Sequence, residues 1–272
     1  MPLIDPVLLK SRLGVLAGRF DVDACDECDS TSSELTRRAE RGAPAGTVIV
    51  ADRQSAGRGR RGRSWLSAPE ASLTFSLLWR FDGTPARLAG LSLAVGVALA
   101  RALESLGGRG IALKWPNDVL LCQAGGYAKL AGILIELSAD RRGTQVIIGI
   151  GLNLRPPAAD LPQAAAGLNQ ALAAEPERHV VLAAILSALA GVLESFAADG
   201  FAGLKAEWQQ RHAWQGELVQ LLGEGEVPVI GRCVGVDDDG ALLLETVDGV
   251  QRIFSGDVSL RRAASTPGVR RA

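Results

Sequence analysis

The sequence has few of the residues that build disulfide frameworks or metal centres. Its 272 residues include four cysteines and two histidines. Four cysteines in a chain of this length do not form the framework of a small secreted domain. Cys25 and Cys28 have the spacing of a redox or zinc pair, but the other two cysteines stand apart and only two imidazoles could join them. We therefore predict no dedicated metal site.

Net charge and long apolar runs are also missing. The 29 basic and 30 acidic residues leave a formal charge of −1, which does not support a globally basic surface for nucleic acid or membrane. No segment approaches the roughly 18 uninterrupted apolar residues of a membrane helix, and Met1–Asp5 does not open a signal peptide. We predict a cytoplasmic protein without a membrane partner, in which anions are recognised locally.

The first two thirds of the sequence alternate between extended and helical patterns. With 47% hydrophobic residues the chain can bury a substantial core. Short β-branched or alternating runs predict strands, and apolar residues at helical intervals predict a helix. The strands are expected at Thr47–Ala51, Ser72–Trp79, Ile111–Trp115, Lys129–Leu137 and Gln145–Leu154, the last two as an antiparallel hairpin, and the helix at Pro85–Leu106. Together they predict a central mixed sheet.

The C-terminal third changes texture near residue 215. Apolar residues at helical spacing predict a helix over His179–Ala198, ended by Gly200, and a shorter one over Leu204–Arg211. Short β runs then alternate with glycine and aspartate turns, as in a small five-stranded SH3-like barrel. We expect a catalytic domain at 1–214, a β domain at 215–262 and a flexible tail at 263–272.

The segment Gly57-Arg58-Gly59-Arg60-Arg61-Gly62-Arg63 places four guanidinium groups on one short loop. Glycine lets backbone approach a ligand, and arginine suits phosphate and carboxylate. The loop also satisfies G-x-G-x-x-G, but the residues after it have no apolar helical stripe and reach Pro69, so a dinucleotide fold is disfavoured. A solvated arginine run is the plain alternative.

Two further clusters favour a site. Lys114-Trp115-Pro116-Asn117-Asp118 places a cation, an amide and a carboxylate at the end of an apolar strand, where sites collect. The segment Lys129–Glu136 carries a lysine at the start of a hydrophobic strand, so we expect the Lys129 side chain to be partly buried, although a strand-edge lysine could also snorkel to solvent.

At these three segments the sequence resembles the biotin protein ligases, whose hallmarks they match in order. The likeness also includes Asp29-Ser30-Thr31, Gln54, Trp65 and Gly149–Asn153, and the family likewise ends in a small β domain. The implied fold is α+β: a mixed central β-sheet with flanking helices, similar to class II aminoacyl-tRNA synthetases, followed by an SH3-like β-barrel.

The resemblance implies a two-step acyl transfer. Biotin would attack the α-phosphate of ATP to give biotinyl-AMP and pyrophosphate, and a lysine of a biotin carboxyl carrier protein, part of a biotin-dependent carboxylase, would then take the biotinyl group. Mg²⁺ is expected to accompany ATP. Cationic side chains would bring a carboxylate and a polyphosphate together despite their mutual repulsion.

The biotin site implied by the resemblance combines one cation with neutral polar groups. We assign Lys129 to bridging the biotin carboxylate and the α-phosphate, because one ammonium can donate to oxygens of both. Gly132 would leave room for biotin against the strand. Ser30, Thr31 and Gln54 match residues that hydrogen-bond the ureido ring, although a helix cap near Ser30 is a compatible alternative.

The arginine loop is expected to serve biotin and adenylate together. Gly57, Arg58 and Arg60 join the biotin set, and we predict that Arg58 and Arg60 close over the reactive anhydride and shield it from water. Arg60 is a catalytic candidate with Lys129. Arg61 adds positive charge near the phosphates. Trp65 is expected to flank adenine, with a core tryptophan as the alternative.

The remaining adenylate contacts are expected from two strand ends. Lys114, Asn117 and Asp118 would lie beside the phosphates, and Asn153 would contact adenine or ribose. We also hypothesise that Asp118 assists deprotonation of the acceptor lysine, whose ordinary pKa is about 10.4.

The sequence departs from the family pattern in three places. Ser32 stands where asparagine is common, Ala128 where a basic residue is common, and Gly125-Gly126-Tyr127 lengthens the approach to Lys129. These departures bear on biotin affinity rather than on reaction class.

Two other function classes stay open. A lipoate or octanoate transferase would share the fold and a similarly placed lysine, and a non-catalytic binding module for nucleotide or nucleic acid would explain the arginines but not Lys129. Some biotin ligases also carry an N-terminal DNA-binding module, yet only 29 residues precede Ser30, so we expect no DNA partner. A homodimer through a sheet edge is compatible with the sequence.

Overall fold

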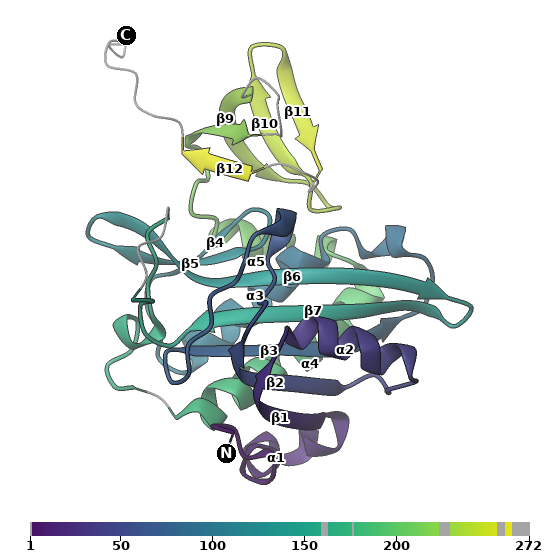
Figure 1. The fold of residues 1–272 in the computed structure, drawn as a ribbon. Helices are drawn as coiled ribbons and strands as arrows, with labels where there is room; N and C mark the ends of the chain where they lie inside the picture. The colour runs from purple at the N-terminus through teal and green to yellow at the C-terminus, as the bar shows by residue number, and fades with distance from the viewer. Residues whose placement is uncertain (1, 159–162, 176, 223–228, 255–258, 263–272) are drawn as a thin grey trace.

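The computed structural model describes residues 2–158, 163–175, 177–222, 229–254 and 259–262. A large sheet with helices on both faces forms the body of the molecule, and a smaller sheet lies at one end of it (Figure 1). The expected tail at 263–272 lies outside the described residues. The α+β class predicted from the sequence is confirmed.

The large sheet has seven strands in the order β1-β2-β3-β7-β6-β5-β4. β1 and β2 run parallel, joined by a helical crossover, and every other neighbouring pair is antiparallel. The sheet is therefore mixed, as expected. Its strands are β1 Asp21–Cys28, β2 Thr47–Gln54, β3 Ser72–Phe81, β4 Ile111–Lys114, β5 Asp118–Gln123, β6 Gly126–Asp140 and β7 Gly143–Asn153.

The central hairpin of this sheet is formed by β6 and β7, as the sequence predicted. The two-residue turn lies between Asp140 and Gly143, which pair across the strands. Gly143 has φ of +119°, and a Cβ there would lie 2.4 Å from the carbonyl oxygen of Phe81. Glycine is thus required for β3 and β7 to run side by side up to the turn.

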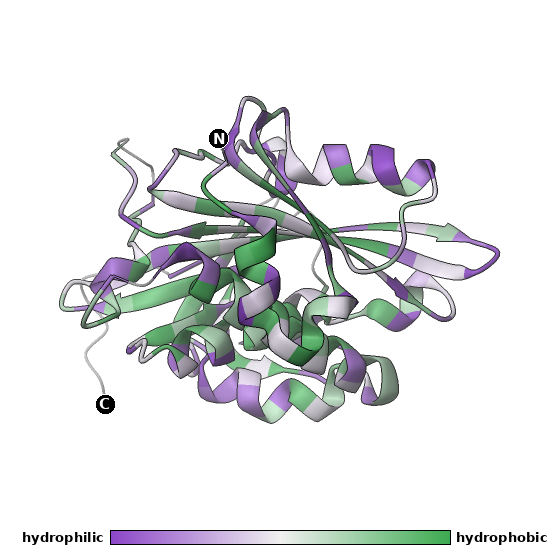
Figure 2. Cartoon of the chain, turned by 90° about the horizontal axis from the view of Figure 1, so that it is seen from below, coloured by the Kyte–Doolittle hydropathy of each residue, from purple (hydrophilic) through white to green (hydrophobic). Residues whose placement is uncertain are grey.

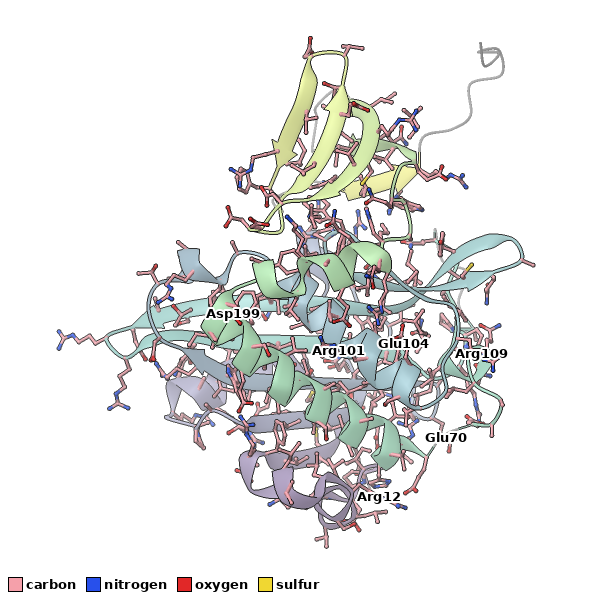
Figure 3. All side chains as sticks on the ribbon, turned by 180° about the vertical axis from the view of Figure 1, so that it is seen from behind. Arg12, Glu70, Arg101, Glu104, Arg109 and Asp199 are labelled. Carbon is pink, nitrogen blue, oxygen red and sulfur yellow. The ribbon has the colours of Figure 1, made fainter. Side chains whose placement is uncertain are left out.

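The helices divide unequally between the two faces. The two long apolar helices α3 (Leu91–Ser105) and α4 (Arg178–Asp199) pack together on one face, whereas the short, hydrophilic α2 (Thr31–Glu40) covers part of the other (Figure 2). In Figure 3, α4 crosses the back of the molecule with Asp199 near its end. The remaining helical segments are α1 Pro6–Leu13, α5 Ala202–Gln210, and the 3-10 turns η1 Gly14–Arg19, η2 Arg60–Gly62, η3 Pro85–Leu88 and η4 Leu168–Gln170.

Among the residues that the structure describes, two helical segments are long and apolar enough to cross a membrane by length and composition alone: Pro85–Ser105 and Arg178–Asp199. More than half of each apolar window is buried inside the protein, where the two helices pack on the sheet and on each other. Core helices of globular proteins pass the same test, so these segments are weak evidence for a membrane partner.

The small sheet is antiparallel, with strand order β11-β10-β9-β8-β12. Within the described residues its outer strands β11 and β12 do not pair, so the expected SH3-like barrel is not closed. It contacts the large domain through the fully buried Trp115, whose Nε1 donates to the carbonyl oxygen of Gly240 at 3.1 Å. The strands are β8 Leu218–Leu222, β9 Val229–Val236, β10 Leu242–Thr246, β11 Gly249–Ile253 and β12 Ser259–Arg262.

Candidate active site

A cavity opens on the α2 face of the large sheet, beside the N-terminus of α2. Its empty space measures about 930 Å³ when the open solvent at its mouth is included. Three of the segments singled out in the sequence meet there, although they come from different elements. The arginine loop, the Lys114–Asp118 turn and the start of β6 all contribute lining side chains.

Two glycines leave bare backbone on the cavity floor. The strand register aligns Thr74, Gly151, Gly132 and Asp118 in one row across β3, β7, β6 and β5. Trp65 lies over this row: a Cβ on Gly151 would come 2.2 Å from its ring, and a Cβ on Gly132 would come 3.2 Å from it. The two glycines therefore admit Trp65 to the sheet surface.

Asp118 joins two lysines at one end of the cavity. Its Oδ1 lies 2.7 Å from Lys129 Nζ and its Oδ2 lies 2.9 Å from Lys114 Nζ. The side chains of Lys114 and Asp118 are 4% and 10% exposed, and that of Lys129 is 27% exposed. The expected partial burial of Lys129 is confirmed, in the fourth position of β6 rather than at its start.

Burial and ion pairing act in opposite directions on these groups. Burial by itself would raise the pKa of Asp118, but Lys129 and Lys114 outweigh it and lower that pKa to about 2. Burial lowers the pKa of Lys114, and Asp118 opposes this. A carboxylate with a pKa near 2 is a weak proton acceptor, which argues against Asp118 as the base that deprotonates an acceptor lysine.

The arginine loop is closed on itself. Gly59 N donates to Arg63 O at 2.7 Å and Trp65 N donates to Gly57 O at 2.9 Å. Within the loop, Arg61 adopts the left-handed region with φ of +59°, an uncommon conformation for a side chain other than glycine. The loop thus presents its arginines from a tight turn that includes the short 3-10 segment η2, and no α-helix begins there, as the sequence indicated.

Two loop arginines reach different neighbours. Arg60 Nη1 donates to Asn117 Oδ1 at 3.2 Å, which links the loop to the Lys114–Asp118 turn. Arg58 Nη2 lies 2.6 Å from Glu136 Oε1, an ion pair at the cavity edge. Both side chains line the cavity, as do Arg61 and Arg63.

The opposite end of the cavity is neutral and polar. Ser30, Thr31, Ser32 and Gln54 line it, and Thr31 N donates to Gln54 Oε1 at 2.7 Å. Ser30 occupies the N-cap position of α2, as the alternative from the sequence had it, but its hydroxyl makes no capping hydrogen bond.

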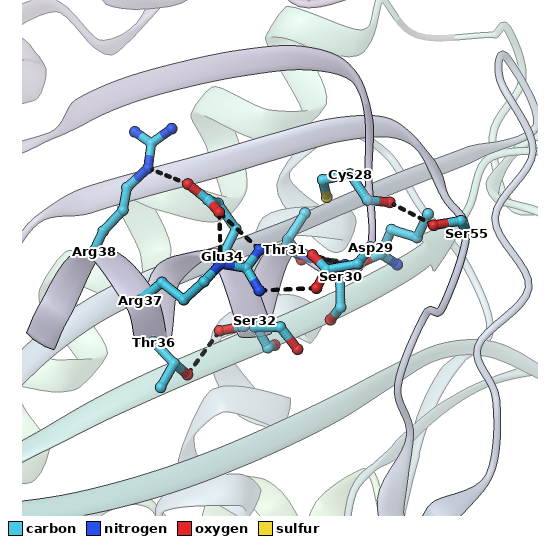
Figure 4. Close-up of polar contacts among 12 residues, drawn as sticks. Cys28, Asp29, Ser30, Thr31, Ser32, Glu34, Thr36, Arg37, Arg38 and Ser55 are labelled. Carbon is cyan, nitrogen blue, oxygen red and sulfur yellow. Dashed lines mark hydrogen bonds and ion pairs between the residues drawn. The ribbon is translucent and has the colours of Figure 1, made fainter.

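A network of charged residues fixes this segment from outside (Figure 4). The Asp29 carboxylate accepts from both terminal nitrogens of Arg37, at 2.9 and 2.8 Å, and from Ser30 N at 2.7 Å. Hydrogen bonds from Arg37 and Ser30 lower the pKa of Asp29 to about 2. Arg37 also bonds to Glu34 within α2, and its pair with Asp29 ties the helix to the end of β1.

Two expected site residues do not line this cavity. Asn153 is buried and its Nδ2 donates to the carbonyl oxygens of Lys129 and Ala166, at 3.3 and 3.1 Å, so the amide connects strand and loop. Gly57 lies behind the lining, where a Cβ would come 2.3 Å from Trp65 O and 3.1 Å from Gln54 Nε2. Gly57 therefore serves the close packing of the loop.

The structure adds site residues that the sequence did not indicate. Leu260 and Arg261 of β12 line the cavity, so the small sheet contributes to it directly. The pKa of Arg261 is lowered by burial and by the nearby charge of Arg63. Lys114 Nζ lies 5.2 Å from the ring centroid of Trp214, in the segment between the two sheets. No motif signals these contacts, because they join residues about 100 or more positions apart.

Comparison with known proteins places this arrangement in a family. Residues 27–153 match the Biotin/lipoate A/B protein ligase family, and residues 216–261 match the Biotin protein ligase C terminal domain. The chain is 34% identical to the bifunctional ligase/repressor BirA of Escherichia coli, over 96% of this chain and 81% of that protein. The chain belongs to the biotin protein ligase family. It is therefore a ligase, as the resemblance implied.

Other members of the biotin protein ligase family agree. The biotin–[acetyl-CoA-carboxylase] ligase of Paracoccus denitrificans is 35% identical, over 85% of this chain and 96% of that protein. A structure of the biotin protein ligase from Aquifex aeolicus in complex with biotin and ATP shares 34% identity, covers 89% of this chain and 99% of that one, and has a TM-score of 0.75. That enzyme binds both expected substrates.

Proposed function

We propose that this protein is an ATP-dependent biotin protein ligase that forms biotinyl-5'-AMP and then biotinylates a lysine of a biotin carboxyl carrier protein. The proposal depends chiefly on the polarity of the cavity. One end offers neutral hydroxyl and amide groups, and the other gathers two lysines and several arginines. This suits an acid with a neutral polar head whose carboxylate meets a polyphosphate.

In the first step, Lys129 bridges the biotin carboxylate and the α-phosphate. Its ammonium is accessible from the cavity, whereas Lys114 is buried and acts as a fixed positive charge beside the phosphates. Asp118 holds both ammonium groups in place. Arg60, which bonds to Asn117, adds positive charge on the side of the arginine loop. Arg261 of β12 adds positive charge on the side of the small sheet.

Mg²⁺ enters, in this proposal, as part of the ATP complex. The described residues contain no group of three acidic, histidine or cysteine side chains able to hold a metal ion. Asp118 is the only carboxylate among the described residues lining the cavity, and both of its oxygens bind lysines. The fit is therefore to a metal carried mainly by phosphates.

In the second step, the acceptor lysine attacks the mixed anhydride and AMP leaves. We propose that the arginine loop shields the anhydride until the carrier arrives, and that the chain divides near residue 215 into a catalytic domain and a β domain that completes the cavity. The reaction needs ATP and a carrier protein, both present in the cytoplasm.

ATP–pyrophosphate exchange tests the first step. We expect exchange when biotin is added. We expect none when lipoate or octanoate is added, and none when no acid is present. Lys129→Ala should abolish it, and Lys10→Ala, an exposed lysine on α1, should leave it intact. Exchange supported by lipoate or octanoate instead would reassign the substrate, and absence of exchange with every acid would refute adenylation.

A further inference from the structure

Behind the neutral end of the cavity, three buried hydroxyls form a chain that ends on Gln54. Ser32 Oγ lies 3.0 Å from Ser76 Oγ, and Ser76 Oγ lies 2.8 Å from Thr31 Oγ1. Thr31 Oγ1 lies 3.2 Å from Gln54 Oε1. Thr31, Ser32 and Gln54 line the cavity, whereas Ser76, on β3 and 0% exposed, does not.

The direction of every proton in this chain follows from its far end. The backbone N–H of Thr31 donates to the Gln54 side chain at 2.7 Å, so the atom that accepts is the amide oxygen. The Thr31 hydroxyl must then donate to the same oxygen. Because a hydroxyl has one proton, Thr31 accepts from Ser76, and Ser76 in turn accepts from Ser32.

The neighbouring strand makes room for this arrangement. Gly149 on β7 pairs directly with Ser76, and a Cβ on Gly149 would lie 2.6 Å from Ser32 Oγ. Any larger residue there would displace Ser32 from the chain. The chain is thus built by four elements: the end of β2, the first turn of α2, the middle of β3 and a glycine of β7.

We propose that Ser76 is a positioning residue that sets the hydrogen-bonding polarity of the cavity floor. Thr31 and Ser32 direct their protons away from the ligand and present oxygen lone pairs to it, and Gln54 keeps its amide N–H₂ as a donor. Such a floor selects a ring that carries N–H donors beside a carbonyl, a cyclic urea. This inference rests on the proposed function and names the residue behind its selectivity.

The selectivity follows from what an unsuitable ring would leave unpaired. A dithiolane such as that of lipoate has no N–H, so it would bury the lone pairs of Thr31 and Ser32 without a partner. Without Ser76, the Ser32 hydroxyl loses its acceptor and is free to turn its proton towards the ligand. The Ser32 hydroxyl proton would then face an N–H of the urea, and the urea would lose a hydrogen bond.

The test is Ser76→Ala, with biotin binding measured by titration calorimetry and KM and kcat measured by pyrophosphate exchange. We expect the biotin Kd and KM to rise about 3- to 10-fold, the loss of one neutral hydrogen bond, while KM for ATP and kcat stay within about twofold. Ser76→Cys keeps a weak donor and acceptor, so its biotin Kd and KM should lie between those of the parent protein and those of Ser76→Ala.

Thr144→Val is the matched control. Thr144 is also a fully buried hydroxyl, and it donates to Gly83 O at 2.8 Å, away from the cavity. The Thr144→Val substitution should lower the melting temperature of the protein without changing its affinity for biotin. An unchanged biotin Kd in Ser76→Ala, or equal losses for biotin and ATP, would overturn the positioning role alone. Failure of the parent protein to bind biotin would overturn the proposed function as well.

Discussion

Replacing Asp118 with asparagine should destabilise the protein and disable the cavity together. In the folded chain the pKa of this carboxyl falls from 3.8 to about 2, which corresponds to about 2 kcal/mol of stability at neutral pH. Asparagine would also leave Lys114, 4% exposed, without its counterion. Removing one partner of a buried ion pair costs about 3–5 kcal/mol, and together with the linkage value this predicts a loss of roughly 2–5 kcal/mol.

The effect should depend on pH in a defined direction. Because the folded pKa of Asp118 lies below the unfolded one, its stabilisation is complete well above pH 3.8, declines as the pH falls towards 2, and is absent below that. The difference between Asp118→Asn and the parent protein should therefore be constant from pH 5 to 7 and shrink below pH 4.

Urea unfolding followed by tryptophan fluorescence measures this difference, and pyrophosphate exchange measures the accompanying loss of activity. Asp140→Asn provides a matched control, because Asp140 forms an exposed pair with Arg80 and should contribute little. A stability within about 1 kcal/mol of the parent protein at pH 7, with exchange intact, would refute the reasoning on Asp118.

Three further substitutions probe the cavity. Gly151→Ala should displace the Trp65 ring, because its Cβ would lie 2.2 Å away; a shifted tryptophan emission and weakened biotin binding are expected, and unchanged spectra would contradict the packing. Trp214→Ala should raise KM for ATP by exposing Lys114, with Trp214→Phe retaining most of the cation–π contact. Arg261→Ala should raise KM for ATP more than KM for biotin; equal changes would place Arg261 outside the phosphate end.

Regular elements were predictable wherever the buried pattern was strong. The β6–β7 hairpin and the helix α4 carry long apolar runs, and both formed close to the expected bounds. β1 was not predicted, because an edge strand needs few apolar residues and half of the side chains in its sequence DVDACDEC are acidic. β5 was not predicted, because the expected strand ended at Trp115. In the structure the chain turns after Lys114 and pairs with β4 again from Asp118.

The site was predictable only where motifs are local. Arg58, Arg60, Lys114 and Lys129 meet at the cavity as expected, because each belongs to a distinctive segment. Arg261 has no such segment, and it lines the cavity because the small sheet packs against the large domain, where Trp115 bonds to Gly240.

Two other residues show the same limit of local motifs. Ser76 looks like any serine in an alternating strand, and only its neighbours on α2 give it a role. Asn153 has a motif, yet its amide bonds to backbone carbonyls instead of the cavity.

Mass spectrometry of a single-turnover reaction tests the central claim most directly. The protein would be incubated with biotin and Mg-ATP, analysed, and then mixed with a biotin carboxyl carrier domain. The account predicts protein-bound biotinyl-5'-AMP that disappears as the carrier gains one biotinyl group, with neither species formed by Lys129→Ala. No adenylate, or an adenylate of lipoate or octanoate in place of biotin, would contradict it.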